Sequence, residues 1–369
     1  MPALAAVGIE RRAAAGESLA QLELASALDA NGEYDAARQW LERAAASGDA
    51  LGRTMLGEVL LSRSPYDVRR GVLLVRAAAE AGNARAAHLL ALLTAAGVGQ
   101  PQSWTNAVGL LLAAALGGST LAQDALANSS SETALAKEAL RSRTKDGAIW
   151  TALAKSIDLQ PFFAAPRPGI VSASPRIAVV RDFLSPELCN WLIARARPVL
   201  RPAEVYDRDS GRLIVDPNRN NRASLFPLVL SDFMLLLLRE RMALVIGLPA
   251  VFMEHPAVLH YRPGEEYRPH WDYCDLTLPG PAKDAAENGQ RVLTFIVYLN
   301  DEYEAGETAF PRLGRQFRGR RGDALFWWNV DPDGKPDEQT LHAGLAPRQG
   351  EKWLFSQWVR DRPGILFRG

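Results

Sequence analysis

The segment LHYRPGEEYRPHWDY (259–273) places a histidine and an aspartate one residue apart. On a β-strand, residues i and i+2 project from the same face, so His270 and Asp272 could bind one metal ion, with Trp271 on the other face. Two ligands make a weak metal site, and a third is required. His342, in TLHAGL, is the only histidine farther along the chain, and it is therefore the third candidate ligand.

A lysine in the same part of the chain suggests what this metal site would serve. Two imidazoles and one carboxylate on one side of an octahedral ion leave three positions open, as in non-haem Fe(II) oxygenases. Lys352 follows His342 by ten residues and opens an apolar, strand-like run. A buried ammonium group is costly unless an anion meets it, which a dicarboxylate cosubstrate would do. Taken alone, the His–Asp pair could be a hydrogen-bonded surface pair, and His342 a loop histidine.

The elements around these residues are mostly short strands. RIAVVRDF begins the region, and RVLTFIVYLN (291–300), DALFWWNV (323–330) and KWLFSQWVRD (352–361) follow, separated by Gly and Pro turns. The run at 291–300 is apolar on both faces, which is typical of a central strand. LSPELCNWLIARARPVL predicts a helix with Ser185 as N-cap and Pro186 at its first position. Short strands behind flanking helices predict a jelly roll, a double-stranded β-helix supported by helices.

The first ~155 residues follow a different pattern, an internal repeat. The phrases RAAAGESLAQ, RAAASGDALG, RAAAEAGNARAA and LAAALGGSTLAQ recur around Gly16, Gly48, Gly82 and Gly118. Each phrase predicts a helix that ends at a left-handed glycine, followed by a second helix. Alanines let such helices approach closely, and stacked pairs bury a continuous core, so a helical solenoid is favoured over an ordinary alanine-rich bundle. His88, in an apolar helix, is expected in this core.

The proline-rich segment LQPFFAAPRPGIVSASPR separates the two patterns. We therefore expect helical repeats over 1–158, a linker over 159–175 and a second domain over 176–369, a multidomain chain that combines an α part with an α+β part.

Composition narrows the classes of partner and compartment. Lys plus Arg and Asp plus Glu number 42 each, so the net charge is zero, which argues against a nucleic-acid partner. Two cysteines are too few for a disulfide framework or a thiolate metal site. The N-terminal residues lack the apolar core of a signal peptide, and charged residues interrupt the apolar run 233–249, so we expect no membrane partner and a cytoplasmic protein.

Together these features resemble the prolyl 4-hydroxylase family of 2-oxoglutarate- and Fe(II)-dependent dioxygenases. LHYRPGEEYRPHWDY, RVLTFIVYLND, AGETAFP, RRGDALFWW and LHAGLAPRQGEKWLFSQWV follow the family pattern in order, within residues 176–362. AGET replaces the usual GGET, and LAPRQG replaces a more typical CPV turn; neither contains a ligand. Residues 10–127 resemble Sel1-like repeats, relatives of the tetratricopeptide repeat, although the fourth copy lacks an acidic or amide residue after its glycine.

The resemblance implies roles for individual residues. It implies iron ligands at His270, Asp272 and His342, and Lys352 as the partner of the distal carboxylate of 2-oxoglutarate. It implies further residues that line the cosubstrate pocket, namely Tyr261, Tyr298 and Thr308. It implies two that help hold a peptide substrate, namely Arg291 and Trp358. Without the resemblance, the two tyrosines could be core aromatics and Thr308 a turn residue. Arg291 could cap a strand, and Trp358 could be an apolar residue that fills the core. His255 and His260 are interpreted as structural.

The implied reaction uses Fe(II), 2-oxoglutarate and O₂, with ascorbate as a candidate reductant, and yields succinate, CO₂ and a hydroxylated product. Relatives that halogenate replace the carboxylate ligand, so Asp272 favours hydroxylation. The long polar segment 204–226 is predicted to be a substrate lid with Arg222 and Ser224 at its hinge, which makes Arg222 a candidate substrate-binding residue.

The repeats suggest a peptide or protein substrate, with a prolyl residue as the expected site of hydroxylation. Three alternatives stay open: an enzyme that hydroxylates a free amino acid or another small metabolite, a non-catalytic scaffold with a degenerate oxygenase fold, and a jelly roll that binds another divalent metal without 2-oxoglutarate.

Overall fold

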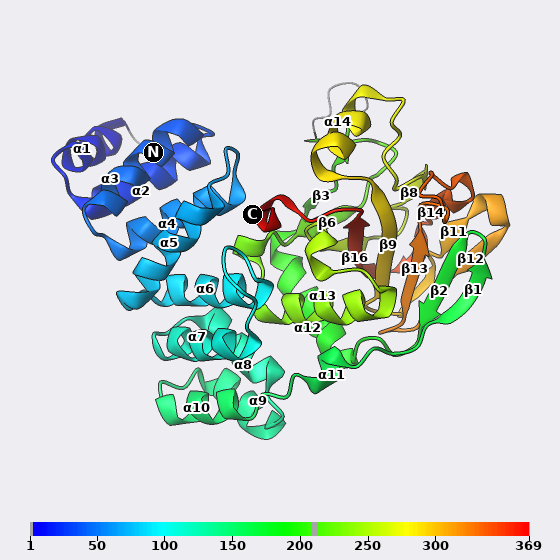
Figure 1. Cartoon of the computed structure of the whole chain (residues 1–369), viewed down its shortest axis with the longest axis horizontal. Coiled ribbons are helices and arrows are strands. Elements are labelled where there is room, and N and C mark those ends of the chain that lie inside the picture. The colour runs from blue at the N-terminus through cyan, green and yellow to red at the C-terminus, as the bar shows by residue number, and fades with distance from the viewer. Residues whose placement is uncertain (1–2, 208–212, 369) are drawn as a thin grey trace. The chain divides into compact units, whose positions relative to one another are not determined.

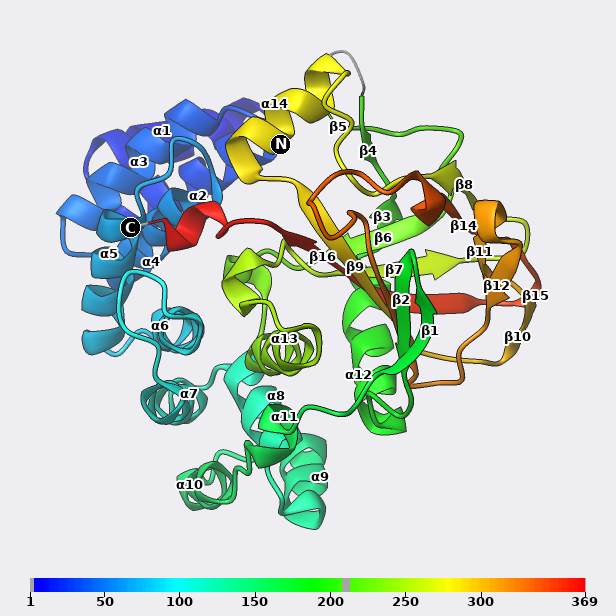
Figure 2. The same ribbon diagram turned by 45° about the vertical axis from the view of Figure 1, so that its right-hand side comes forward.

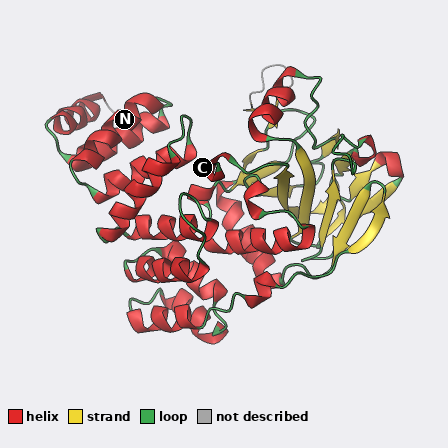
Figure 3. Ribbon diagram, viewed as in Figure 1, coloured by secondary structure: helices red, strands yellow, loops and turns green. Residues whose placement is uncertain are grey.

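The computed structural model describes residues 3–207 and 213–368, which divide into two compact units (Figure 1). The first unit comprises residues up to 161 together with 228–238, and the second comprises 162–227 and 239–368. Strands are confined to the second unit within the described part of the chain (Figure 3).

The first unit is built from helices that pack as successive hairpins. In chain order they are α1 (Ala3–Ala14), α2 (Ser18–Ala30), α3 (Tyr34–Ala46), α4 (Ala50–Ser62), α5 (Val68–Glu80), α6 (Ala84–Ala96), α7 (Trp104–Leu116), α8 (Thr120–Ser129), α9 (Thr133–Ser142) and α10 (Gly147–Lys155). The predicted solenoid of helical repeats is confirmed. His88 is buried in α6, as expected.

The four marker glycines end the first helix of each hairpin. Gly16, Gly48, Gly82 and Gly118 have φ angles of 92°, 91°, 85° and 89°, a left-handed conformation that costs glycine little. The residue after the glycine caps the next helix in three of the four repeats. The exception is the first repeat, where Glu17 makes no side-chain cap hydrogen bond. In the fourth repeat, Ser119 accepts a hydrogen bond from the backbone of Ala122, so a hydroxyl replaces the Asp49 and Asn83 caps of the second and third repeats.

Small residues bring paired helices close together. A Cβ atom on Gly57 of α4 would lie 2.6 Å from Cγ2 of Val75 in α5, so only glycine permits this approach. The first unit also includes η2 (Leu228–Leu230), which packs against α4 and α6, and the start of α13 (Phe233–Ile246). There Met234 Sδ accepts a hydrogen bond from Ser129 Oγ at 3.0 Å. Within the run at 233–249, residues 233–246 form α13, whose first half is buried, and no described helix is long and apolar enough to cross a membrane.

The second unit contains two main antiparallel sheets (Figure 2). The eight-stranded sheet has the order β1 (Gly169–Ala173), β2 (Arg176–Val180), β13 (Ala324–Trp328), β9 (Arg291–Tyr298), β16 (Lys352–Arg360), β7 (Ala257–Tyr261), β6 (Arg222–Leu225) and β3 (Arg201–Pro202). The four-stranded sheet has the order β12 (Arg315–Phe317), β11 (Thr308–Phe310), β14 (His342–Gly344) and β8 (Tyr267–His270). Two ribbons pair β10 (Tyr303–Ala305) with β15 (Pro347–Gly350), and β4 (Val205–Tyr206) with β5 (Leu213–Ile214).

The core of this unit lies between the two sheets. Alternate residues of the large sheet, such as Tyr261, Ile296 and Leu354, pack there together with Phe310 of the small sheet. Helix α12 (Pro186–Ala196) packs on β7 and begins as predicted, because Ser185 accepts a hydrogen bond from the backbone of Leu188. Helix α14 (Pro279–Asn288) separates β8 from β9. The predicted jelly-roll fold is confirmed.

The segment 159–175, expected to be a linker, contains ordered elements. It includes α11 (Gln160–Phe163) and β1, and β1 pairs with β2 at the edge of the large sheet. Prolines prevent a long helix here but permit a strand at a sheet edge, where one row of backbone groups stays unpaired.

Candidate active site

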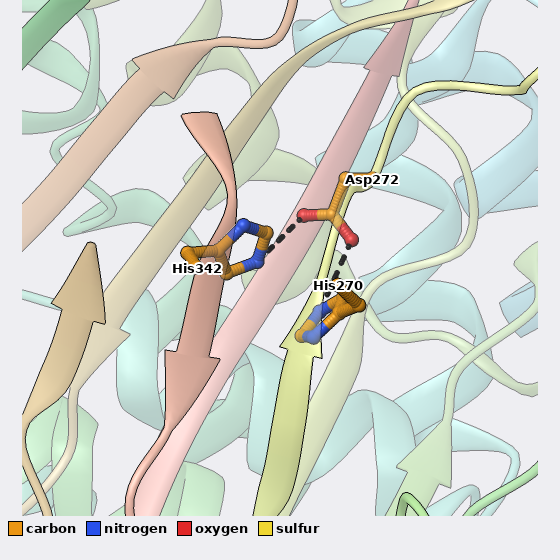
Figure 4. Close-up of side chains that lie close together, drawn as sticks. All are labelled: His270, Asp272 and His342. Carbon is orange, nitrogen blue, oxygen red and sulfur yellow. Dashed lines mark ion pairs between the residues drawn. The ribbon is translucent and has the colours of Figure 1, made fainter. Parts of the chain in front are cut away.

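The candidate metal ligands come from two neighbouring strands of the small sheet. His270 is the last residue of β8, His342 is the first residue of β14, and the antiparallel register places them opposite each other. Asp272 follows in the bend after β8, so the pair sits at the end of a strand and not within one. Figure 4 shows both imidazole rings and the carboxylate turned toward one another.

The three side chains form a compact donor set. Asp272 Oδ2 lies 3.3 Å from Nε2 of His342, and Oδ1 lies 3.7 Å from Nε2 of His270. One ligand atom from each of the three residues lies within 4.8 Å of the others. Asp272 and His342 are buried and His270 is largely so. Two nitrogens and one carboxylate oxygen on one side of a small space match the open donor set of a non-haem Fe(II) centre.

Each imidazole is held by a hydrogen bond from its Nδ1 atom. Nδ1 of His270 donates a hydrogen bond to the carbonyl oxygen of Arg268 at 2.7 Å, and Nδ1 of His342 donates to that of Thr340 at 3.0 Å. A carbonyl oxygen only accepts, so both Nδ1 atoms carry a proton, and the Nε2 atom of each ring faces the carboxylate. Burial, followed by the nearby His342, lowers the pKa of His270 to about 3, so its ring is neutral and available to a metal.

A buried polar chain orients the carboxylate. Thr294 of β9 donates its hydroxyl to Asp272 Oδ2 at 2.7 Å, and the same hydroxyl accepts from Asn329 Nδ2 at 3.0 Å. Burial by itself would raise the pKa of Asp272, but the two histidines and the Thr294 hydrogen bond outweigh burial and lower it. Asp272 is therefore an anion that is ready to bind a cation.

Lys352 supplies the opposite charge in the same interior. It opens β16 as predicted, is fully buried, and its Nζ makes no hydrogen bond to any residue that the structure describes. Nζ lies 5.1 Å from the ring centroid of Tyr261, the residue opposite it on β7. Burial lowers the pKa of Lys352 to about 7, and Glu307 only partly opposes this. An unpaired buried ammonium group is the expected counterpart of a carboxylate ligand.

The other candidate cosubstrate residues lie in the same core. Tyr261 and Tyr298 are both buried there, and burial raises the pKa of Tyr261 to about 12, so its hydroxyl stays protonated. Tyr298 Oη donates to Oγ1 of Thr308 at 3.0 Å, which joins the large sheet to β11. Lys352 thus lies beside Tyr261, and Tyr298 is hydrogen-bonded to Thr308.

The two candidate substrate residues Arg291 and Trp358 contact each other. The guanidinium carbon of Arg291 lies 3.9 Å from the centroid of the Trp358 ring. Its Nε and Nη2 donate to the carboxylate of Glu254 at 2.6 and 3.0 Å. Glu254 also accepts from Arg360 at 2.5 Å, so a partly buried ion-pair network fixes Arg291 against the indole.

Arg222 does not face the interior that contains the other candidate site residues. It is exposed on β6, and the register pairs it with His260, whose neighbour Tyr261 points into the core. Neighbouring strand residues point to opposite faces, so Arg222 projects from the outer face of the sheet. His260 lies on that face too, with its ring centroid 4.1 Å from that of Trp353. His255 precedes β7 and is not part of the donor set.

The predicted lid includes residues 208–212, which lie outside the described residues. Its proposed hinge at Arg222 and Ser224 is instead part of the large sheet, where β6 pairs with both β3 and β7. Ser224 is buried, and its hydroxyl donates to the carbonyl oxygen of Ala196 at 2.9 Å. A strand paired on both sides does not act as a hinge, so that prediction is wrong.

Sequence reasoning missed Thr294 and Asn329. Thr294 is the polar residue in the apolar run RVLTFIV, at even spacing from Tyr298 and therefore on the same face of β9. A buried threonine on a central strand needs a hydrogen-bond partner, and that requirement could have pointed to Asp272. Asn329 follows β13 and carries no local signal.

Comparison with known proteins places the second unit in a family. Residues 256–360 match the 2OG-Fe(II) oxygenase superfamily. Prolyl 4-hydroxylase 1 of Arabidopsis thaliana is 34% identical over 210 residues, which cover 53% of this chain and 72% of that protein. A crystal structure of the viral collagen prolyl hydroxylase of Paramecium Bursaria Chlorella virus-1 is 28% identical with a TM-score of 0.38, covering 50% of this chain and 95% of that one.

The Sel1 repeat protein from Oxalobacter formigenes is 24% identical with a TM-score of 0.28, covering 37% of this chain and 96% of that one. The identity to the plant enzyme and the share of its length that is covered settle the family of this chain. It belongs to the prolyl 4-hydroxylases, which are 2-oxoglutarate- and Fe(II)-dependent dioxygenases.

Proposed function

We propose that this dioxygenase hydroxylates a prolyl residue in a peptide or protein substrate, with Fe(II) held by His270, Asp272 and His342 and 2-oxoglutarate held by Lys352. The observation that carries the proposal is the unpaired, fully buried Nζ of Lys352 in the interior that also contains the three-residue donor set. When bound, the metal and cosubstrate supply the oxidative chemistry.

The side chains of the chain have separate tasks in this proposal. The two Nδ1 hydrogen bonds hold the imidazoles so that their Nε2 atoms face a common point. Thr294 keeps the Asp272 carboxylate turned toward them. Lys352 attracts the distal carboxylate, and Tyr261 and Tyr298 enclose the pocket and exclude water.

A peptide substrate is supported by the pair of Arg291 and Trp358. An indole face offers an apolar surface to a pyrrolidine ring, and Glu254 holds the guanidinium beside it. The helical repeats support the same proposal, because solenoids present extended surfaces to polypeptides. Ascorbate is proposed as the reductant that restores Fe(II) after unproductive turnover.

The proposal is tested by incubating the enzyme with Fe(II), 2-oxoglutarate and ascorbate, together with a panel of synthetic proline-containing peptides. Mass spectrometry should detect one added oxygen atom on a prolyl residue and an equal amount of succinate. Asp272→Ala should yield neither product.

Free proline is the matched competitor in this experiment. Oxygen added to free proline but to none of the peptides would favour an enzyme of small metabolites. Peptide hydroxylation that persists in Asp272→Ala, or no succinate from the wild-type enzyme with any substrate, would contradict the proposed site.

A further inference from the structure

Three residues before β6, the chain runs alongside the strand that carries His270. The backbone N–H of Arg268 donates to the carbonyl oxygen of Asn218 at 2.9 Å, and that of Asn220 donates to Glu266 at 3.2 Å. Arg219 and Tyr267 form the antiparallel bridge between these bonds. Because β8 is the edge strand of the small sheet, the segment 218–220 extends that sheet by one short strand.

The side chain of Arg219 is fixed in this position. It is only 6% exposed, and its guanidinium carbon lies 4.8 Å from the ring centroid of Tyr267. Nη1 donates to the carbonyl oxygen of Glu204 at 2.9 Å, and Nε donates to Oδ1 of Asn221 at 3.3 Å. A planar guanidinium can stack on an aromatic ring and donate within its own plane at the same time, which an ammonium group does not do.

The ring of Tyr267 in turn lies on the imidazole of His270. Their centroids are 3.4 Å apart and their planes differ by 16°, which is a parallel stack. An imidazole at this distance covers one face of the phenol ring, so the guanidinium of Arg219 lies over the other. Arg219, Tyr267 and His270 therefore form one continuous stack that ends at a candidate metal ligand.

The other histidine is held differently. His342 lies against Trp327 and Phe310, with ring centroids 4.6 and 5.9 Å away, and both of these rings are fully buried in the core. His270 is less buried, and its ring orientation depends on the Arg268 carbonyl oxygen and on Tyr267. The support of His270 thus includes a segment that lies outside the two sheets proper.

We propose that Arg219 is a positioning residue for His270, acting through Tyr267. The inference rests on the proposed metal site. Loss of the guanidinium would free Tyr267 to move and would let the imidazole rotate about its Nδ1 hydrogen bond, so that Nε2 no longer faces Asp272. Substitutions of residues that orient a metal-bound histidine typically weaken metal binding by about 10- to 100-fold.

The test is a Co(II) titration of the metal-free, full-length protein, followed by the visible absorption of the bound ion. Arg219→Met should weaken Co(II) binding by about tenfold and change the absorption spectrum, because the coordination geometry changes. Arg219→Lys should be intermediate, since it keeps the positive charge over Tyr267 but loses the planar fork. Thermal unfolding of each variant shows whether it is folded.

Arg262→Met is the matched control. It removes an exposed positive charge from the turn after β7, where the guanidinium pairs with the neighbouring Glu265, and it leaves the 218–220 segment and the Arg219 stack in place. Its Co(II) affinity and spectrum should equal those of the wild type. An equal loss in both variants would mean that general electrostatics, and not the stack, determines metal affinity, and would overturn the inference.

A double-mutant cycle tests the path through the tyrosine. If Arg219 acts through Tyr267, Arg219→Met should have little further effect on Co(II) affinity in a Tyr267→Leu background. Fully additive effects would contradict the inference, as would wild-type binding and spectrum in a folded Arg219→Met variant. His342→Ala separates the two proposals: if this variant also binds Co(II) like the wild type, the metal site itself is wrong.

Discussion

The two ends of the jelly-roll interior differ in how their polar groups are satisfied. At the donor set, Nδ1 of each histidine and one oxygen of Asp272 have protein partners, and only the atoms that face the common point are left. At Lys352 the ammonium group has no hydrogen-bond partner among the described residues. The first arrangement orients three donors toward a site for a cation. The second is completed only by an anion that brings its own charge.

The largest effect is expected from breaking the donor set. His342→Ala removes one of three ligands, and Co(II) affinity should fall by more than about 100-fold, beyond the effect of losing a residue that only orients a ligand. Turnover should be undetectable while thermal unfolding shows a folded protein. Metal titration and succinate formation measure these two effects. A Co(II) affinity close to that of the wild type would show that His342 is not a metal ligand.

Replacing Lys352 with methionine should separate function from stability. Turnover at ordinary 2-oxoglutarate concentrations should be lost, while the cosubstrate-free protein becomes more stable by at most about 5 kcal/mol. The folded pKa of Lys352, about 7, lies below its value of 10.5 in the unfolded chain. The unfolded state therefore binds the extra proton between these values, and the destabilisation is complete below pH 7 and fades toward pH 10.5.

Chemical denaturation at several pH values checks this prediction. The gain in stability of Lys352→Met over the wild type should shrink as the pH rises. A variant less stable than the wild type at pH 7 would show that Lys352 has a stabilising partner. The contrast between a hydrogen-bonded donor set and an unpaired lysine would then be wrong.

Thr294→Val tests the support of the metal end. It removes the donor to Asp272 and leaves Asn329 Nδ2 without its acceptor. Metal affinity should fall by about tenfold, and the free energy of unfolding by about 1–3 kcal/mol. Thr308→Val, the same change in the same interior but without a bond to a ligand, should leave Co(II) affinity unchanged. Equal affinities for all three proteins would show that Asp272 needs no orienting partner.

The last expected effect, no larger than about tenfold within one pH unit, is a pH dependence of 2-oxoglutarate binding. Below pH 7 Lys352 carries its proton before the cosubstrate binds, and above pH 7 binding must take up a proton. Affinity should therefore weaken by up to about tenfold per pH unit above 7. Lys352→Arg keeps its charge throughout, so any binding that it retains should be independent of pH in this range. If the affinity of the wild type for 2-oxoglutarate does not change with pH in this range, the pKa of Lys352 does not lie there.

Sequence patterns predicted what local spacing determines. The marker glycines fix where each repeat helix ends, and a run that is apolar on both faces identifies β9 as a central strand. The three ligand positions and Lys352 follow from motif spacing; the structure groups the three ligands and places Lys352 beside Tyr261. Contacts made by tertiary folding were not predictable: the Thr294–Asn329 chain joins two strands, and the Arg219 stack depends on a segment whose hydrogen bonds to β8 have no sequence signature. The side of the sheet to which Arg222 points depends on register.

The proposed function requires that Lys352 binds the distal carboxylate of 2-oxoglutarate while the histidines and Asp272 hold the metal. The most direct test is an anaerobic calorimetric titration of the Co(II)-loaded protein with 2-oxoglutarate, comparing the wild type with Lys352→Met at pH 7. The wild type should bind one equivalent, and the variant should bind at least about 100-fold more weakly while keeping its Co(II) affinity. Equal 2-oxoglutarate affinity in the two proteins would contradict this role of Lys352.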